Sequence, residues 1–169
     1  MIYDNSEVRR RDRLLEEEAA RHLLEQGEYG ILSLVDEYGE AYGVCTNYVW
    51  DGDHSLYTHC APEGRKLRCI DAHPQVSFTV IGHTQVVPEH FTTEYQSIVL
   101  CGTARRALSD DEKKKGLMLI VKKFAPAYEE RFHAALDRSF HRVEMIRIDV
   151  DRWSGKTKKM KLQPEGHIF

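Results

Sequence analysis

Short apolar segments separated by turn signals are the feature that most constrains the fold. Residues 29–35 read YGILSLV, which is apolar on both faces and too short for a helix. A tight turn is expected over residues 36–39, and residues 41–50 supply the return strand. The Asp-Gly pair at 51–52 is a strong hairpin signal that leads into a strand at residues 56–59. Three strands that follow one another through short turns predict an antiparallel meander.

Three further strands are expected later in the chain. Alternating apolar residues predict strands over residues 76–81 and 143–150. Residues 95–108 predict a long strand with Gly102 in its middle, where a glycine commonly marks a bulge or a bend at a barrel corner. Residues 83–89 are expected to form a polar loop.

Helical spacing of apolar residues predicts four helices. The first begins near residue 14 and ends at Gly27, and the second covers residues 63–71 and is stopped by a His-Pro pair. The third covers residues 109–123 and starts with a capping box, in which the serine accepts from the N3 amide and the glutamate reaches back. Pro126 begins the fourth.

Six strands linked mainly by hairpins, with helices inserted after the third and the fifth, predict a small, mainly β antiparallel barrel with peripheral helices. A doubly wound fold is disfavoured by the hairpins and by the absence of a GxGxxG turn. The length suits a single domain over residues 1–169. Within it, residues 1–13 form a basic lead-in and residues 156–169 a polar tail.

Composition narrows the possible partners. Lys plus Arg at 24 nearly balance Asp plus Glu at 27, and a net charge of -3 argues against a nucleic-acid binder. No apolar run is long enough for a membrane helix, and the N-terminus has no apolar signal region. The 4 cysteines form no CxxC pair and the histidines lack HxxxH spacing, so neither disulfides nor a metal site is expected. These observations indicate a cytoplasmic protein.

The stretch over residues 55–68, SLYTHCAPEGRKLR, has the features of an anion site. A strand ends at His59 and Cys60, and a Pro-Glu-Gly turn then opens a helix whose first N–H groups have no partners inside it. Arg65, Lys66 and their neighbour at position 68 add positive charge, so a phosphate monoester would fit there. The alternative is a plain strand-to-helix connection with a solvated basic face.

The order of these segments resembles the flavin split barrels similar to pyridoxamine 5'-phosphate oxidase, and among them the nitroimidazole-resistance, nitroreductase-like group. The resemblance rests on RRRDR, EYGILSLVDEYGEAYGVCTNYVW, LYTHCAPEGRKLRCI, HPQVSFTVIG, FTTEYQSIVLCGTARR, EKKKGLMLIVKKFAP and DRWSGK. It implies a six-stranded antiparallel split β-barrel. It also implies a homodimer with FMN bound in clefts between the subunits.

The resemblance also assigns residues to the cofactor. The flavin and its ribityl chain are assigned Val44, Cys45, Thr46 and Asn47, and the phosphate is assigned Thr58, Gly64, Arg65 and Lys66. Ser97 falls where the long strand approaches the flavin, and Trp153 with Lys156 closes the site, often from the other subunit. His59 matches a histidine beside the flavin, where it orients a substrate or gives a proton to a reduced product.

Each assignment has a structural alternative. The segment 44–46 would pack in a barrel wall regardless of any cofactor, and a tryptophan such as Trp153 is more often a core or interface anchor than a ligand contact. His59 can be purely structural. Asn47 is harder to explain without a partner, because a buried amide needs hydrogen bonds. Nothing in the sequence indicates that Cys60 is an activated nucleophile.

The activity implied is that of an FMN-dependent oxidoreductase that takes electrons from NAD(P)H or another donor and reduces a nitroaromatic or quinone-like acceptor. Two alternatives stay open: a flavin- or haem-binding storage or sensor module without turnover, and an F420-dependent reductase. Ala41 and Cys45 stand where many relatives have proline, which alters the wall beside the flavin. The tail lacks the arginine-histidine element of true pyridoxamine phosphate oxidases, so that activity is not expected.

Overall fold

A computed structural model of the protein describes residues 1–159, except for the side chains at 133–135 and 137. The strands are β1 (Ile2–Tyr3), β2 (Tyr29–Val35), β3 (Ala41–Asn47), β4 (Val49–Trp50), β5 (Ser55–Cys60), β6 (Gln75–Val87), β7 (Thr92–Arg105) and β8 (Glu144–Lys158). The helices are α1 (Glu17–Gln26), α2 (Arg65–Ala72), α3 (Asp110–Phe124) and α4 (Glu129–Ser139).

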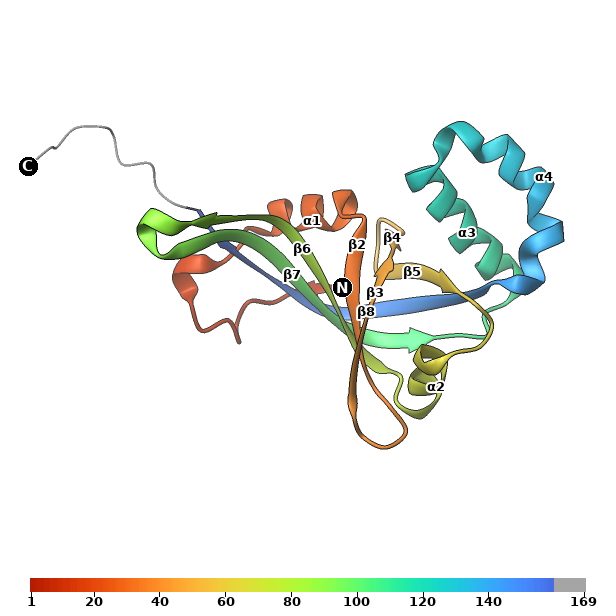
Figure 1. Ribbon diagram of the computed structural model, residues 1–169, viewed down its shortest axis with the longest axis horizontal. Coiled ribbons are helices and arrows are strands. Elements are labelled where there is room, and N and C mark those ends of the chain that lie inside the picture. Colours follow the sequence, from red (N-terminus) through yellow and green to blue (C-terminus); the bar gives the residue numbers. More distant parts are fainter. Residues whose placement is uncertain (160–169) are drawn as a thin grey trace, which may run out of the picture.

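The strands form one sheet in the order β3-β2-β6-β7-β8-β5-β4, and β1 pairs with β8 outside this path (Figure 1). Neighbours along the path are antiparallel, whereas β1 is parallel to β8. The two end strands, β3 and β4, are separated in the chain by Tyr48 alone. The sheet therefore curls until its ends meet at one residue without closing by hydrogen bonds, which confirms the predicted split-barrel fold. The predicted number of six strands is wrong, because the sheet has eight strands and the strand expected at 41–50 is divided at Tyr48.

The core lies inside this curled sheet, with helices over its ends. Fully buried side chains from most strands meet there, among them Leu32, Phe78, Ile98 and Ile146. The amphipathic helices α1 and α2 contribute Ala20, Leu24, Leu67 and Ile70 to the same cluster. These helices form because their apolar residues recur on one face that the barrel buries.

Helix α3 covers a second, smaller cluster on the outside of β5 and β8. Leu117 and Ile120 pack there with Tyr57 and Met145. The Ser109 hydroxyl accepts from the Glu112 amide at 3.3 Å, which confirms half of the predicted capping box. The Glu112 carboxylate does not reach back to the cap, because it accepts instead from the Tyr57 hydroxyl and from the Arg147 guanidinium.

Several predicted element ends are wrong. The polar loop expected at 83–89 is mostly strand, since β6 continues to Val87, and β8 continues to Lys158 beyond the expected end at 150. Both extensions pair along the main chain with β7, so their polar side chains do not prevent strand formation. The predicted tail at 156–169 therefore starts inside a strand, and its residues 160–169 lie outside the described residues.

The N-terminal prediction also needs a correction. The basic lead-in contains β1 and a 3-10 turn over Arg11–Arg13, and α1 starts at Glu17 rather than at position 14.

Among the described residues, no helix is both long enough and apolar enough to cross a membrane.

Candidate functional site

The predicted basic turn between β5 and α2 is formed as the sequence indicates. β5 ends at Cys60, and Gly64 immediately precedes α2 with a φ of 148°, a backbone conformation that favours glycine. Gly64 has no side chain to cap the first N–H groups of the helix. These groups and the partial positive charge of the helix start are therefore available to an anion.

The first two basic side chains of α2 have different surroundings. The Arg65 guanidinium donates a 2.8 Å hydrogen bond to the Asp36 carboxylate, and it lies 4.5 Å from the centre of the Tyr42 ring. Lys66 instead lies close enough to His59 and Cys60 for its charge to affect both groups. Lys66 is thus the basic residue of this turn that shares the end of β5 with the predicted catalytic histidine.

His59 is half-buried, and its Nδ1 atom is fully buried without a hydrogen-bond partner among residues 1–159. Burial, with a smaller contribution from the charge of Lys66, lowers the pKa of His59 below its ordinary value. The imidazole is therefore neutral at neutral pH. A buried ring nitrogen without a partner, next to a lysine and a helix start, is what a bound polar group would complete.

Cys60 does not behave as an activated nucleophile. Burial raises the pKa of its thiol, and the positive charge of Lys66 does not compensate for this. The thiol is therefore protonated at neutral pH, in agreement with the sequence-based expectation.

The four consecutive residues assigned to the flavin point alternately into and out of the barrel. Val44 packs against the core and Thr46 is buried, whereas Cys45 is exposed on the opposite face of β3 together with Asn47. The Thr46 hydroxyl is hydrogen-bonded to the Thr58 hydroxyl at 2.7 Å inside the barrel. A cofactor outside the sheet would therefore contact the side chains of Cys45 and Asn47, and only the backbone of Val44 and Thr46.

The candidates on β7 and β8 are likewise divided between the outer and inner faces of the sheet. Ser97 of β7 pairs directly with Lys156 of β8, so their side chains lie together on the outer face. Trp153 lies on the inner face with 2% of its surface exposed, and its ring packs edge-on against Tyr3 with centroids 4.7 Å apart. Its contact with a cofactor stays a prediction, and in this chain the indole is part of the core.

The candidates at the end of β5 and the Ser97–Lys156 pair are far apart within one chain. On β8, Ile146 pairs with Thr58 and Lys156 pairs with Ser97. Ten residues of strand between these two positions span roughly 30 Å. One small ligand cannot contact both groups of the same chain.

The outer side of β3, β2 and parts of β6 and β7 carries a patch without charged side chains, which we call the outer sheet face. Strand alternation and the buried residues on the opposite side define its members. They are Tyr29, Ile31, Ser33, Val35, Ala41, Gly43, Cys45, Asn47, Ser77, Thr79, Ile81, Ser97, Val99 and Cys101. Tyr29 and Ile81 are 59% and 55% exposed, so this apolar surface is open in the isolated chain.

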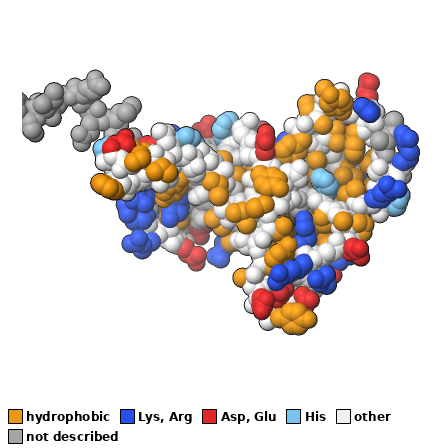
Figure 2. Space-filling model, in the orientation of Figure 1, with side chains coloured by type: hydrophobic (Ala, Val, Ile, Leu, Met, Phe, Trp, Pro, Cys, Tyr) orange, Lys and Arg blue, Asp and Glu red, His pale blue; other side chains and the backbone are white. Residues whose placement is uncertain are grey.

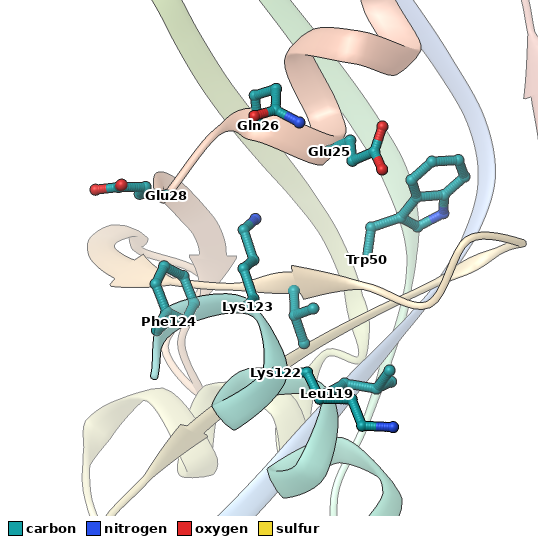
Figure 3. A pocket seen from close by; sticks show the side chains of 9 residues that line it. Glu25, Gln26, Glu28, Trp50, Leu119, Lys122, Lys123 and Phe124 are labelled. Carbon is teal, nitrogen blue, oxygen red and sulfur yellow. The ribbon is translucent and has the colours of Figure 1, made fainter. Parts of the chain in front are cut away.

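A separate cleft of about 460 Å³ lies between α1, β4 and α3 (Figure 3). Trp50 and Phe124 stand on opposite sides of it, and Lys123 lies between them. The Lys123 ammonium donates to the backbone carbonyls of Gly27 and Tyr48, which ties α3 to the barrel. The residues that line this cleft include none of those predicted to bind the cofactor.

Sequence reasoning missed one residue at the basic turn. Asp36 was expected only as a turn residue, yet its side chain is 5% exposed and binds Arg65. An aspartate followed three residues later by glycine predicts the turn, but no local pattern pairs it with a residue 29 positions away.

The curled sheet, whose end strands β3 and β4 meet at Tyr48, defines a split-barrel protein together with the basic turn after β5. A family model described as pyridoxamine 5'-phosphate oxidase matches residues 16–157. The chain therefore belongs to the pyridoxamine 5'-phosphate oxidase family. A comparison with curated protein sequences finds no match.

Solved structures agree on the fold. A Bacteroides thetaiotaomicron protein, provisionally described as a 5-nitroimidazole antibiotic resistance protein, is 20% identical with a TM-score of 0.71, covering 86% of each chain. An FAD-binding protein from Mesorhizobium loti is 22% identical with a TM-score of 0.65, covering 87% of this chain and 98% of its own. The FAD and haem binding protein from Mycobacterium smegmatis is 18% identical with a TM-score of 0.75, covering 88% of this chain and 74% of its own.

Proposed function

We propose that this protein is an FMN-dependent oxidoreductase that transfers electrons from NAD(P)H or another donor to a small aromatic acceptor. The observation that carries the proposal is the buried Nδ1 atom of His59, which has no hydrogen-bond partner among residues 1–159. It lies next to Lys66 and the start of α2. Membership of the family and the similarity to flavin-binding proteins support a flavin as the ligand. The four free cysteines suit a reducing cytoplasm.

The phosphate of FMN fits the basic turn. Backbone N–H groups at the start of α2, freed by the absence of a side chain at Gly64, donate to phosphate oxygens, and Lys66 supplies a positive charge. The Thr58 hydroxyl is buried inside the barrel, where it shares a 2.7 Å hydrogen bond with the Thr46 hydroxyl. Lys66 and the helix start therefore hold the phosphate, and Thr58 supports the barrel wall behind them.

A homodimer would complete the site. The basic turn and the Ser97–Lys156 pair lie roughly 30 Å apart along β8, too far for one ligand within one chain. The outer sheet face, which Ser97 joins to this pair, is uncharged and partly apolar, which suits burial against a second copy. In our proposal the cofactor contacts the basic turn of one subunit and the Ser97–Lys156 pair of the other.

The bound flavin would supply the electron transfer itself, and the protein would position and shield it. His59 is neutral at neutral pH, so it forms a hydrogen bond with the electron-accepting substrate, as donor or acceptor, rather than carrying a charge. Cys45 and Asn47 present small polar side chains beside the ring. Ala41 and Cys45 leave this wall open to a planar nitroaromatic or quinone-like acceptor.

A binding module without turnover is the second candidate, because two similar structures are described as flavin- and haem-containing proteins. The deciding experiment is to purify the protein, release its chromophore by denaturation and identify it by mass. We expect FMN, and consumption of NAD(P)H that depends on an added nitroaromatic or quinone. Haem, F420 or no chromophore after reconstitution would refute the FMN proposal, and bound FMN without turnover would favour the module.

A further inference from the structure

The turn between β2 and β3 is tied to the start of α2 by a buried carboxylate. Asp36 is 3% exposed, and its Oδ1 atom accepts from the backbone amides of Tyr38 and Glu40 at 3.0 and 2.9 Å. Its Oδ2 atom accepts from the Arg65 guanidinium at 2.8 Å. Both carboxylate oxygens therefore have partners, one in the turn and one in the helix.

The Arg65 guanidinium has a second contact besides Asp36. Its guanidinium lies 4.5 Å from the centre of the Tyr42 ring, a cation–π arrangement, and it is the first residue of α2 after Gly64. Figure 2 shows Lys and Arg side chains over the region of α2 beside acidic side chains toward the tip of the β2–β3 hairpin. The pair thus holds the first turn of α2 against the hairpin, which positions the neighbouring Lys66.

We infer that Asp36 is a positioning residue for the phosphate site, and that Arg65 holds the start of α2 through Asp36 rather than binding the phosphate directly. This inference rests on the proposed FMN function and refines it. It assigns the phosphate contact to Lys66 and the helix N–H groups. Arg65, which the family resemblance assigns to the phosphate, has a structural role instead.

The two possible roles of Arg65 predict opposite effects of Asp36→Asn. If Arg65 binds the phosphate, removing the negative charge of Asp36 frees the guanidinium and tightens FMN binding. If Asp36 positions the helix start, Asp36→Asn loosens it and weakens FMN binding. Asparagine keeps an oxygen acceptor for the turn amides, so this substitution mainly removes the bond to Arg65.

The experiment measures the dissociation constants of FMN and of riboflavin, which lacks the phosphate. We expect Asp36→Asn to weaken FMN binding about tenfold, as expected for loss of a charged hydrogen bond, and to leave riboflavin binding unchanged. Arg65→Gln should have a similar effect, and the double variant should be no weaker than either single variant. The matched control is Glu37→Gln, because Glu37 forms an exposed 3.7 Å pair with Arg68 of the same helix and should change neither constant.

A second measurement uses the wild-type protein and avoids any folding defect of the variants. The Arg65 hydrogen bond, with the Glu40 and Tyr38 amides, lowers the pKa of Asp36. A carboxyl NMR titration should find this pKa below its ordinary 3.8 both without FMN and with FMN bound.

The inference is overturned if Asp36→Asn binds FMN as tightly as wild type or more tightly, or if riboflavin binding weakens equally. A pKa of Asp36 at or above its ordinary 3.8 in the FMN complex would overturn it as well, since Arg65 would then have left the carboxylate. A wild-type protein that binds riboflavin and FMN with equal affinity would overturn both this inference and the phosphate site, whereas the other outcomes leave the phosphate site intact.

Discussion

Thr46 and Thr58 share a buried hydroxyl–hydroxyl hydrogen bond of 2.7 Å across the interior of the barrel. Thr46 lies on β3 and Thr58 on β5, which stand near opposite ends of the sheet order. The bond therefore links the two ends of the curled sheet where no ladder of main-chain hydrogen bonds joins them. It also fixes the barrel wall behind the basic turn.

The first prediction concerns this bond. Thr46→Val should lower the free energy of unfolding by about 1–2 kcal/mol, because the Thr58 hydroxyl is left buried without its partner. The double variant Thr46→Val/Thr58→Val should recover part of that loss, since both polar groups are then removed. Chemical denaturation of the single and double variants measures the difference. Strictly additive losses would show that the two hydroxyls do not interact.

A second prediction concerns Gly102, where the register between β7 and β8 shifts. A Cβ atom there would lie 2.0 Å from the Asp149 carbonyl oxygen, and backbone cannot easily move away. Gly102→Ala should therefore destabilise the protein by about 3 kcal/mol. Gly43→Ala is the control, because its Cβ would meet only an ordinary 3.7 Å contact with Ile31. Equal melting temperatures of the two variants would contradict the close approach at Gly102.

The third prediction is the titration of His59. Wild-type His59 should titrate below its ordinary pKa of 6.5, mainly because of burial and partly because of the charge of Lys66. Lys66→Ala should raise this pKa without restoring 6.5, because burial remains. Since the folded pKa is lowered, the histidine's contribution to stability is present above 6.5 and is lost as the pH falls below it. Ring NMR titrations of both proteins test this, and a wild-type pKa at or above 6.5 would contradict it.

The fourth prediction concerns the charged groups beneath α3. Hydrogen bonds from Tyr57 and Arg147 lower the pKa of Glu112 from its ordinary 4.5. Burial alone would raise the pKa of Asp149, but Arg105 and Arg147 outweigh it and lower the pKa from 3.8. Both groups therefore contribute stability above these ordinary values, and the contribution is lost as the pH falls through the folded pKa values.

The test compares wild type with Glu112→Gln/Asp149→Asn in unfolding experiments at several pH values. Wild type should be more stable at neutral pH, and its advantage should shrink as the pH falls below about 4.5. An advantage that stays constant down to strongly acidic pH would show that these carboxylates do not hold α3 through their charge.

Much of the fold follows from local patterns in the sequence. The Asp-Gly turn at 51–52 and the serine cap of α3 are specified by the conformations and hydrogen bonds that these residues allow. The register shift at Gly102 is indicated by a glycine because the Asp149 backbone leaves no room for a side chain there. The C-terminal ends of β6 and β8 are not specified by local patterns, because these parts carry polar residues whose main chain pairs with β7. Strand pairing there depends on a neighbour distant in sequence, which periodicity cannot reveal.

The site was predictable in its parts but not in its arrangement. The sequence places Gly64, Lys66 and His59 at one turn, as the structure does. It does not indicate that Arg65 is bound to Asp36, and it leaves open whether Trp153 packs in the core, at an interface or against a ligand. Both depend on which face of the curled sheet a residue occupies, and on contacts between segments that are remote in the chain.

The central claim is that the turn between β5 and α2 holds the phosphate of FMN through Lys66. Isothermal titration of the reconstituted protein with FMN and with riboflavin, for wild type and Lys66→Ala, tests it most directly. Arg68→Ala is the matched control, because Arg68 lies on the same helix but is 60% exposed and faces Glu37. We predict that wild type binds FMN more tightly than riboflavin, that Lys66→Ala loses about tenfold in FMN affinity, and that Arg68→Ala loses little. Full FMN affinity in Lys66→Ala, or no preference of wild type for FMN over riboflavin, would contradict the claim.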